Sequence, residues 1–170
     1  MKQNAIPHYD MSVNETGCCP RFNPEGWDNE TLHFVDKPFL RATTKGANHV
    51  PLDMDTVFTR VHEHMSEANA INEDNTLVLS RDLSASLGEH LFAIPDGVDV
   101  PDEERVSLTG DFITRVFEGP YEQARDWMGA MTQAAKDKGG DGEEVYFFYT
   151  TCPKCAQAYG KNYVVGFARV

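Results

Sequence analysis

Apolar residues recur with a helical period in two stretches of the chain. In the segment 52–68 they are three and four residues apart, as one face of an α-helix requires; they are Met54, Val57, Phe58, Val61 and Met65. The segment 119–140 has a similar stripe, made of Tyr121, Ala124, Trp127, Met128, Met131 and Ala135. Proline near its start and glycines at its end are typical helix boundaries. The pattern predicts two amphipathic helices.

Apolar runs of strand length flank these helices, bounded by turn-forming residues. They lie at 37–46, 75–82, 89–97, 110–119, 144–151 and 161–170. The order strand, helix, strand, strand therefore occurs twice, in a first repeat at about 36–96 and a second at about 106–170. This order predicts an α+β fold in which duplicated β-α-β-β units form one antiparallel sheet, with two helices on one face. We expect a ligand groove on the other face.

Residues 1–33 have neither period and are rich in Pro, Asn, Gly and acidic residues. We interpret them as an irregular N-terminal arm packed on a domain of residues 34–170. Phe22 and Trp27 are the arm's large apolar residues, and Phe34 follows just beyond it. These side chains are expected to hold the arm on the domain.

The amino-acid composition limits the classes of partner that this protein is expected to bind. The net charge of −12 argues against a nucleic-acid partner, because phosphate binding depends on clustered Lys and Arg. The same charge favours a cationic ligand. Neither a signal peptide nor an apolar run of membrane-spanning length is present, so we expect a cytoplasmic protein with no membrane partner. Cysteines there are reduced unless they bind metal or do redox chemistry.

The entry into the second helix carries a motif. Gly119, Pro120 and Tyr121 form a Gly-Pro-Tyr turn between a strand and a helix, and the chain ends in YVVGFARV. Over residues 36–170 these features resemble the GyrI-like small-molecule-binding family. That family often carries a ligand-facing glutamate two residues before a strand tyrosine. The resemblance implies Glu144 if the tyrosine is Tyr146; if it is Tyr149, Phe147 takes the glutamate's place.

Three segments extend the resemblance to a bacterial subgroup commonly labelled hydrolase: TGCCPRFNPEGWD, RVFEGPY and YTTCPKCAQAYGKNYVV. Some GyrI-like proteins hydrolyse strained, cyclopropane-bearing genotoxins, and others only bind flat hydrophobic cations. The resemblance therefore implies a small-molecule-binding protein that hydrolyses a hydrophobic, planar or strained xenobiotic. The alternative is a non-catalytic binder that sequesters flat hydrophobic cations. A third interpretation makes the open sheet face a subunit interface.

Aromatic residues cluster on the predicted strands and suit a slot for a planar ligand. Alternate side chains of the segment 144–151 face opposite sides, so one set packs under the helices and the other lines the groove. The sequence does not decide which set does which, and an ordinary aromatic core is the competing interpretation. The residues expected to bind the ligand are Trp127, Tyr121, Phe147, Tyr146, Phe92, Trp27 and His90.

Hydrolysis needs a base that activates water and a donor that stabilises the leaving group. Carboxylates beside aromatic walls tend to have a raised pKa, which suits that work at neutral pH. Glu118 at a strand's end and Glu89 at a strand's start are the candidate bases, and the Tyr149 hydroxyl is the candidate donor. This chemistry requires no cofactor, and the sequence has no nucleophile-elbow motif.

The four cysteines form an adjacent pair and a C-x-x-C pair. Cys152 and Cys155 have the spacing of a zinc knuckle, and Pro153 favours a tight turn between them. Cys18 and Cys19 complete four thiolates of a structural zinc site if the arm folds back over that turn. The interpretation that the sequence favours is that reduced cysteines pack the arm against the sheet. A redox role is disfavoured, because such motifs usually open a helix in a thioredoxin-like unit.

Overall fold

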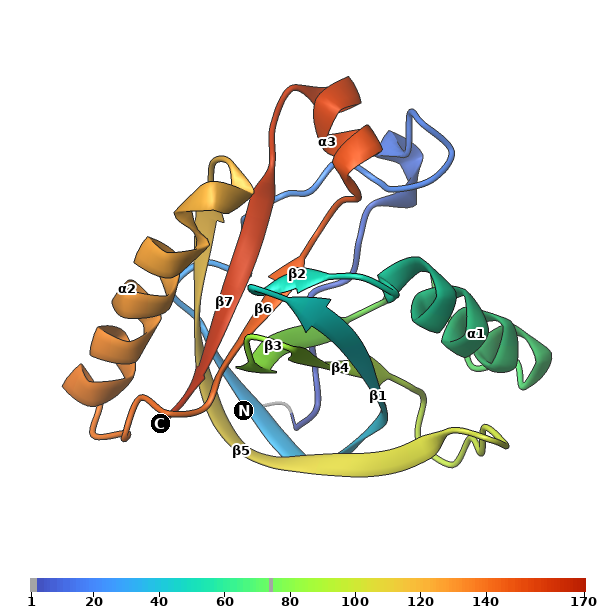
Figure 1. Cartoon of the computed structure of the whole chain (residues 1–170), viewed down its shortest axis with the longest axis horizontal. Coiled ribbons are helices and arrows are strands. Elements are labelled where there is room, and N and C mark those ends of the chain that lie inside the picture. Colours follow the sequence, from blue (N-terminus) through green and yellow to red (C-terminus); the bar gives the residue numbers. More distant parts are fainter. Residues whose placement is uncertain (1–2, 74) are drawn as a thin grey trace. The chain divides into compact units, whose positions relative to one another are not determined.

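The computed structural model describes residues 3–73 and 75–170, and within them it has α+β architecture with antiparallel strands and three α-helices (Figure 1). The α-helices are α1 (Met54–Glu67), α2 (Ala124–Asp137) and α3 (Pro153–Tyr159). The strands are β1 (Thr31–Ala47), β2 (Val50–Pro51), β3 (Val78–Ser84), β4 (Leu87–Ala93), β5 (Glu104–Glu118), β6 (Val145–Tyr149) and β7 (Tyr163–Arg169). Two 3-10 helices, η1 (Met11–Val13) and η2 (Tyr121–Gln123), complete the described elements.

The chain forms two compact units, and each is described by itself. Residues up to Val35 join Gly110–Val170 in one unit, which we call the arm unit. Asp36–Thr109 form the other, which we call the middle unit. The first strand-helix-strand-strand series contributes most of the middle unit, and the second contributes most of the arm unit.

In the middle unit, β2, β1, β4 and β3 lie in that order and pair antiparallel. Leu40 of β1 pairs with Phe92 of β4, and both side chains are buried. The apolar face of α1 shares their cluster, because three of its predicted stripe residues are buried there: Val57, Val61 and Met65. The three-and-four spacing therefore predicted this helix and its buried face correctly.

In the arm unit, β6, β7 and β5 lie in that order and pair antiparallel, with α2 packed along β7 and β6 (Figure 1). Met131 of α2 is fully buried against β7. Gly166 allows this close approach, because a Cβ there would lie 2.7 Å from the Met131 sulfur. The other members of this buried cluster are Trp127, Ala135, Val145, Phe147, Val164 and Ala168.

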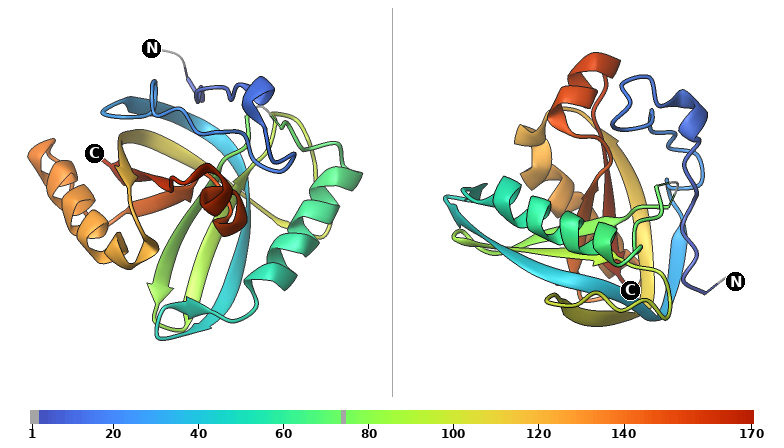
Figure 2. Two further views of the ribbon diagram at one scale, coloured as in Figure 1. Left: turned by 90° about the horizontal axis from the view of Figure 1, so that it is seen from above. Right: turned by 90° about the vertical axis from the view of Figure 1, so that its right-hand side faces the viewer.

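The arm covers the other face of the same three strands. Trp27 is 2% exposed, and its ring centroid lies 5.5 Å from that of Phe148 and 6.2 Å from that of Phe167. The backbone amide of Thr114 on β5 donates to the Glu30 carbonyl of the arm. Figure 2 shows the blue arm and the orange α2 on opposite sides of β7. In this unit the arm therefore occupies the face on which we expected a ligand groove.

Several details differ from the sequence-based expectations. The segment in which Pro153 was expected to favour a tight turn forms α3, which ends at Gly160 in the left-handed conformation that glycine favours (φ 73°). The arm contains η1, whose first turn is capped by the Asp10 carboxylate. β5 begins at Glu104, earlier than its apolar pattern. η1 and the end of α3 depend on local hydrogen bonds, which a hydrophobic period does not report.

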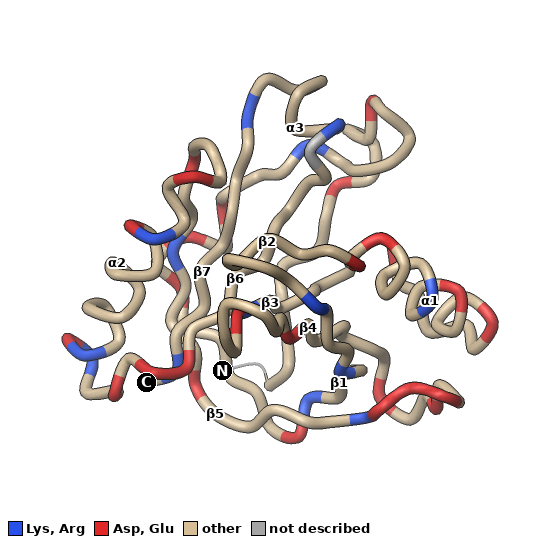
Figure 3. The backbone as a smooth tube through the Cα atoms, viewed as in Figure 1, with Lys and Arg blue, Asp and Glu red and all other residues tan. Residues whose placement is uncertain are grey.

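The structure also gives the lengths of the helices and the placement of the charged residues. In the parts of the chain that the structure describes, no helix has the length and apolar character to cross a membrane. Lys and Arg are spread along the chain among more numerous Asp and Glu (Figure 3). The absence of a nucleic-acid partner stays a prediction.

Candidate functional site

Two of the expected ligand-binding aromatics lie in the core beneath α2. Trp127 is 5% exposed and stacks on Phe117, with ring centroids 5.6 Å apart and an interplanar angle of 15°. Phe147 is likewise 5% exposed and belongs to the same buried cluster. Their apolar area stabilises the packing of the helix on the sheet, so these two residues form core instead of an open groove.

Tyr146 lies on the opposite face of β6 and is also buried. Its hydroxyl donates to Glu144 at 2.9 Å, and its ring centroid is 6.4 Å from that of Phe112. Glu144 in turn accepts from Arg169, whose guanidinium lies over the Phe112 ring. The carboxylate two residues before Tyr146 is therefore engaged in an ion pair, and the tyrosine holds that pair in place.

Tyr121 and Tyr149 meet at the surface of the arm unit. Their exposed fractions are 36% and 44%, and their ring centroids are 5.6 Å apart. Burial raises the pKa of Tyr121, and the thiols of Cys152 and Cys19 raise it further. The structure thus brings the candidate donor Tyr149 beside one predicted ligand-binding residue, close to the cysteines.

Glu89 is held by two arginines of the middle unit. Arg41 Nε donates to its Oε2 at 2.6 Å, and Arg81 Nε donates to its Oε1 at 2.8 Å. Burial acts to raise the pKa of Glu89, but the hydrogen bonds from Arg41 and Arg81 outweigh it and keep the pKa below its ordinary value. A raised pKa was expected for a pocket base, so the shift has the opposite sign. Glu89 is a fixed carboxylate and a poor proton acceptor.

His90 and Phe92 are buried in the middle unit. His90 Nε2 lies 2.9 Å from the Thr44 hydroxyl, and Nδ1 lies 2.7 Å from the Ser80 hydroxyl. Burial lowers the pKa of His90 to about 4, so the ring is neutral at pH 7. Phe92 is 5% exposed and belongs to the α1 core cluster. Neither side chain is open to a ligand from solvent, because the hydroxyls and the α1 packing enclose them.

Glu118 is exposed at the end of β5. It pairs with Tyr163 of β7, so both side chains lie on the face of the sheet that the arm covers. The Tyr163 ring centroid is 5.7 Å from that of Phe22 in the arm. Of the two predicted bases, Glu118 is the one that belongs to the arm unit.

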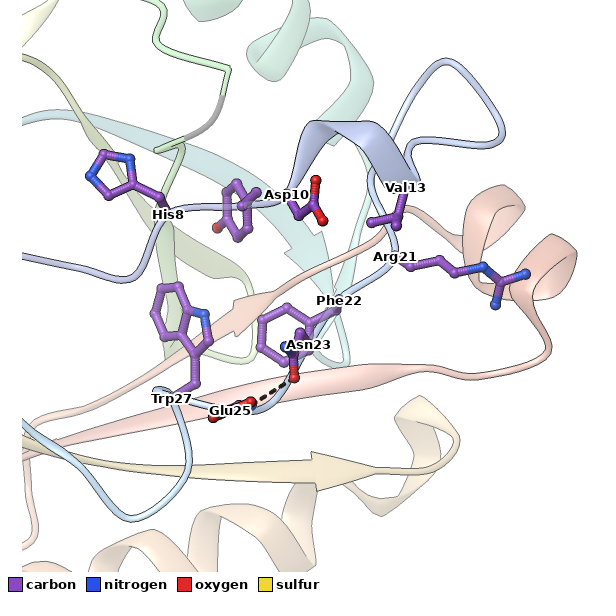
Figure 4. A pocket seen from close by; sticks show the side chains of 9 residues that line it. His8, Asp10, Val13, Arg21, Phe22, Asn23, Glu25 and Trp27 are labelled. Atoms are coloured by element: carbon purple, nitrogen blue, oxygen red, sulfur yellow. Dashed lines mark hydrogen bonds between the residues drawn. The ribbon is translucent and has the colours of Figure 1, made fainter.

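A pocket of about 300 Å³ lies within the arm (Figure 4). Three aromatic rings form its apolar wall: Tyr9 stacks on Trp27 at 6.3 Å, and Phe22 is 5.9 Å from Trp27. Figure 4 shows the Phe22 and Trp27 rings side by side, while the Arg21 guanidinium turns away from them. The remaining lining residues are His8, Asp10, Val13, Arg21, Asn23 and Glu25.

The pocket has two carboxylates, Asp10 and Glu25. Hydrogen bonds from the Ser12 hydroxyl and amide lower the pKa of Asp10, which is therefore ionised at neutral pH. Glu25 is exposed, and its amide donates to the Asn23 side chain at 3.0 Å. Arg21 is paired with Glu15 at 2.8 Å and lies over the Tyr159 ring. The pocket lining thus holds two carboxylates and one guanidinium, and Glu15 outside the lining pairs with that guanidinium.

Sequence reasoning found Trp27 but missed the other walls of this pocket. The signal was present in FNPEGWD, where Asn23 and Gly26 are turn-forming residues between two aromatics. In the structure Gly26 has φ of 84° and the turn brings Phe22 and Trp27 together. Two aromatics flanking such a turn are thus a usable sign of a local pocket.

The four cysteines converge in the arm unit. The sulfurs of Cys18, Cys19, Cys152 and Cys155 all lie within 4.8 Å of one another, and all four are free thiols. Cys155 is buried, Cys19 and Cys152 are half-buried, and Cys18 is exposed. The arm folds back over the turn at the start of α3, as a shared site requires. This is the one group of metal-binding side chains found among the described residues.

Polar groups surround these sulfurs. The Thr16 hydroxyl lies 3.2 Å from the Cys155 sulfur, and this contact lowers the pKa of Cys155 to about 7 against the effect of burial. Burial raises the pKa of Cys19, although the Cys152 amide donates to its sulfur. The Tyr159 hydroxyl donates to the Cys19 carbonyl. The group is therefore a hydrogen-bonded cluster and not a chance approach of four side chains.

The sequence model of a family described as "Bacterial hydrolase" matches residues 9–170. The chain belongs to this family. The match reaches into both units and includes all four cysteines and every lining residue of the arm pocket except His8. It agrees with the hydrolase-labelled subgroup that the three motifs suggested, while kinship with GyrI-like proteins stays a prediction.

A solved structure shares the fold of this bacterial hydrolase family member, and a second is similar at a lower score. A hydrolase from Listeria innocua is 14% identical with a TM-score of 0.57, and the likeness covers 95% of this chain and 99% of that one. The structure of SAV2435 bound to tetraphenylphosphonium is 10% identical with a TM-score of 0.46, and covers 82% of this chain and 91% of that one. Among curated proteins, no sequence matches this chain.

Proposed function

We propose that this chain is a hydrolase that takes a hydrophobic, preferably cationic small molecule into the arm pocket. The observation that carries the proposal is a pocket with three aromatic rings on one side and two carboxylates at its edge, in a chain of the bacterial hydrolase family. The volume of about 300 Å³ is at the lower end of the range for small-molecule sites. A compact ligand with one apolar ring system fits that space.

The aromatic wall of the pocket determines which kind of ligand it favours. The half-buried rings of Tyr9 and Phe22 offer apolar contact and a negative ring face to a cation, and the buried Trp27 ring packs behind them. The ionised Asp10 adds a full negative charge, which it keeps over the whole neutral range. A flat ligand with a delocalised positive charge gains from both contributions, and an anion loses.

Two carboxylates are candidates to activate water. Glu25 lines the pocket itself, and Glu118 lies on the sheet face beneath the arm beside Tyr163, whose ring contacts Phe22. Asp10 is less suited to proton transfer because its lowered pKa weakens it as a base. We assign the base to Glu25 and keep Glu118 as the second carboxylate to be tested. Tyr149 as donor to the leaving group stays a prediction.

A mass-spectrometric time course tests this proposal, with an excess of a cyclopropane-bearing alkylating agent over protein. A ring-opened, water-added product in excess of the protein is expected, with a loss of at least tenfold in Glu25→Gln. Glu30→Gln changes an exposed acid of the same arm outside the pocket and serves as the control. Loss in Glu118→Gln alone would move the base to β5. Product no greater than one equivalent per chain would refute catalysis.

The aromatic rings and the Asp10 carboxylate that line the same pocket favour a second candidate, a protein that binds a cation without changing it. A permanent charge beside three rings needs no proton transfer to hold a ligand. This function predicts saturable quenching of Trp27 fluorescence by a flat aromatic cation, weakened in Phe22→Ala, with the dye recovered unchanged. Trp127 lies in the α2 core and provides an internal reference signal.

A further inference from the structure

We infer that Cys18, Cys19, Cys152 and Cys155 bind one zinc ion as four thiolate ligands. Four sulfurs around a tetrahedral zinc at about 2.3 Å are separated by roughly 3.8 Å. The two adjacent sulfurs are 3.7 Å apart, and all four lie within 4.8 Å of one another. Small shifts of the side chains bring the set to zinc geometry with no change of the backbone path.

The donor set selects the metal and the type of site. Four thiolates in a tetrahedral arrangement suit zinc, and they exclude Mg²⁺ or Ca²⁺, which prefer oxygen. All four positions are filled by protein, which leaves none for water or substrate, so the site is structural and not catalytic. Binding replaces thiol protons with the metal, and those protons pass to solvent.

Local structure orients the sulfurs. Gly17 has φ of 74° and turns the chain so that adjacent cysteines both face the cluster. The Thr16 hydroxyl accepts from the amides of Cys18 and Cys19 at 3.3 and 3.4 Å and contacts the Cys155 sulfur. Hydrogen bonds from residues next to the ligands orient metal ligands and support their charge. The arrangement is that of a turn shaped around an ion.

The exposure of the cysteines also fits a site that zinc enters after folding has begun. Cys18 is exposed and gives the ion a path from solvent, while Cys155 is 1% exposed and closes the inner side. The ion joins parts of the chain that are far apart, since Cys18 and Cys19 belong to the arm and Cys152 and Cys155 to the start of α3. Closing so long a loop restricts the unfolded chain strongly, so the metal stabilises the arm in its packed place.

The test measures metal in protein made without a histidine tag and kept reduced. One zinc per chain is expected by mass spectrometry of the elements. Cys152→Ser and Cys18→Ser are expected to lose it at least tenfold, while Lys154→Ala, in the same turn but with all thiols kept, retains it. Zinc retained in both serine variants would overturn the assignment of the ligands.

A second measurement does not depend on how well the variants fold. Cobalt added to metal-free wild-type protein is expected to give the strong visible bands and thiolate charge-transfer absorption of tetrahedral sulfur coordination. Absence of these bands, together with no metal in the purified protein, would refute the site. Iron at one equivalent per chain, or two disulfides in the unreduced intact mass, would refute zinc as its occupant.

Discussion

The hydroxyl of Thr114 on β5 donates a hydrogen bond to the backbone carbonyl of Trp27 in the arm. The same hydroxyl accepts from the Glu30 amide at 3.2 Å, and Thr114 is 1% exposed. One buried side chain therefore satisfies backbone groups of the arm that would otherwise lie unpaired against the sheet. These two hydrogen bonds hold the backbone of the arm in place against β5.

Replacing Thr114 with valine is expected to lower the free energy of unfolding by about 1–3 kcal/mol, because a buried donor and acceptor lose their partner. Urea unfolding measures the loss. Thr114→Ser keeps the hydroxyl and should recover most of it, and Thr43→Val, at an exposed position of β1, is the control. Equal stability of Thr114→Val and wild type would contradict a structural role for this bond.

Glu89→Gln is expected to destabilise the protein by roughly 1–3 kcal/mol at pH 7, because two arginines lose a buried carboxylate. Glu104→Gln is the matched control: Glu104 bonds the same Arg41, but its side chain is 57% exposed, so its loss should stay within about 0.5 kcal/mol. Guanidinium chloride would screen these ion pairs, so urea is the denaturant of choice. Similar losses in both variants would show that burial of Glu89 adds nothing.

His90 predicts a loss of stability in acid. Its pKa is lowered to about 4 in the folded protein, against about 6.5 unfolded, so between those values the unfolded chain takes up a proton that the folded protein does not. Stability attributable to His90 is therefore complete above pH 6.5 and falls by roughly 3 kcal/mol as the pH drops to 4.

The measurement is the free energy of unfolding at several pH values, with NMR titration of the imidazole. His90→Gln should reduce the dependence between pH 6.5 and 4, and His62→Gln, at an exposed position of α1, should not. An imidazole that titrates near 6.5 in the folded protein would contradict the enclosed, neutral ring described here.

Metal removal is expected to release the arm without unfolding α2. A strong chelator applied to the zinc-loaded protein should open the chain to trypsin after Arg21, which lies two residues beyond Cys19 and is exposed. Cleavage there should accelerate at least tenfold and be reversed by added zinc. Identical cleavage with and without chelator would show that the arm is held by its aromatic contacts alone.

The sequence predicted the elements whose side chains obey a period, and it failed where they do not. Val57, Val61 and Met65 mark α1 because burial of one helix face requires that spacing. α3 has seven residues, too few for a period, and it was missed. In β6 both alternate sets are apolar, so the pattern could not tell which faces α2; the structure puts Phe147 there and Phe148 against the arm.

The residues of the candidate site also differ in whether the sequence alone could identify them. The cysteine cluster could be predicted because cysteine is a metal ligand in any secondary structure. Glu89 could not be assigned from sequence, because its partner Arg41 is 48 positions away and is set by strand register. The pocket needed the fold of the arm, which depends on local bonds such as that of Asp10 with Ser12.

The arm unit is interrupted by the middle unit, and this has a consequence during synthesis. Trp27 leaves the ribosome long before Phe148 and Phe167, the rings on which it rests. At roughly 5–20 residues per second, its resting place appears about 7–28 s later. During that time the apolar side chains of Tyr9, Phe22 and Trp27 are exposed on the nascent chain, where chaperones and neighbouring chains can bind them. The arm therefore cannot pack in its native position until β7 has been synthesised.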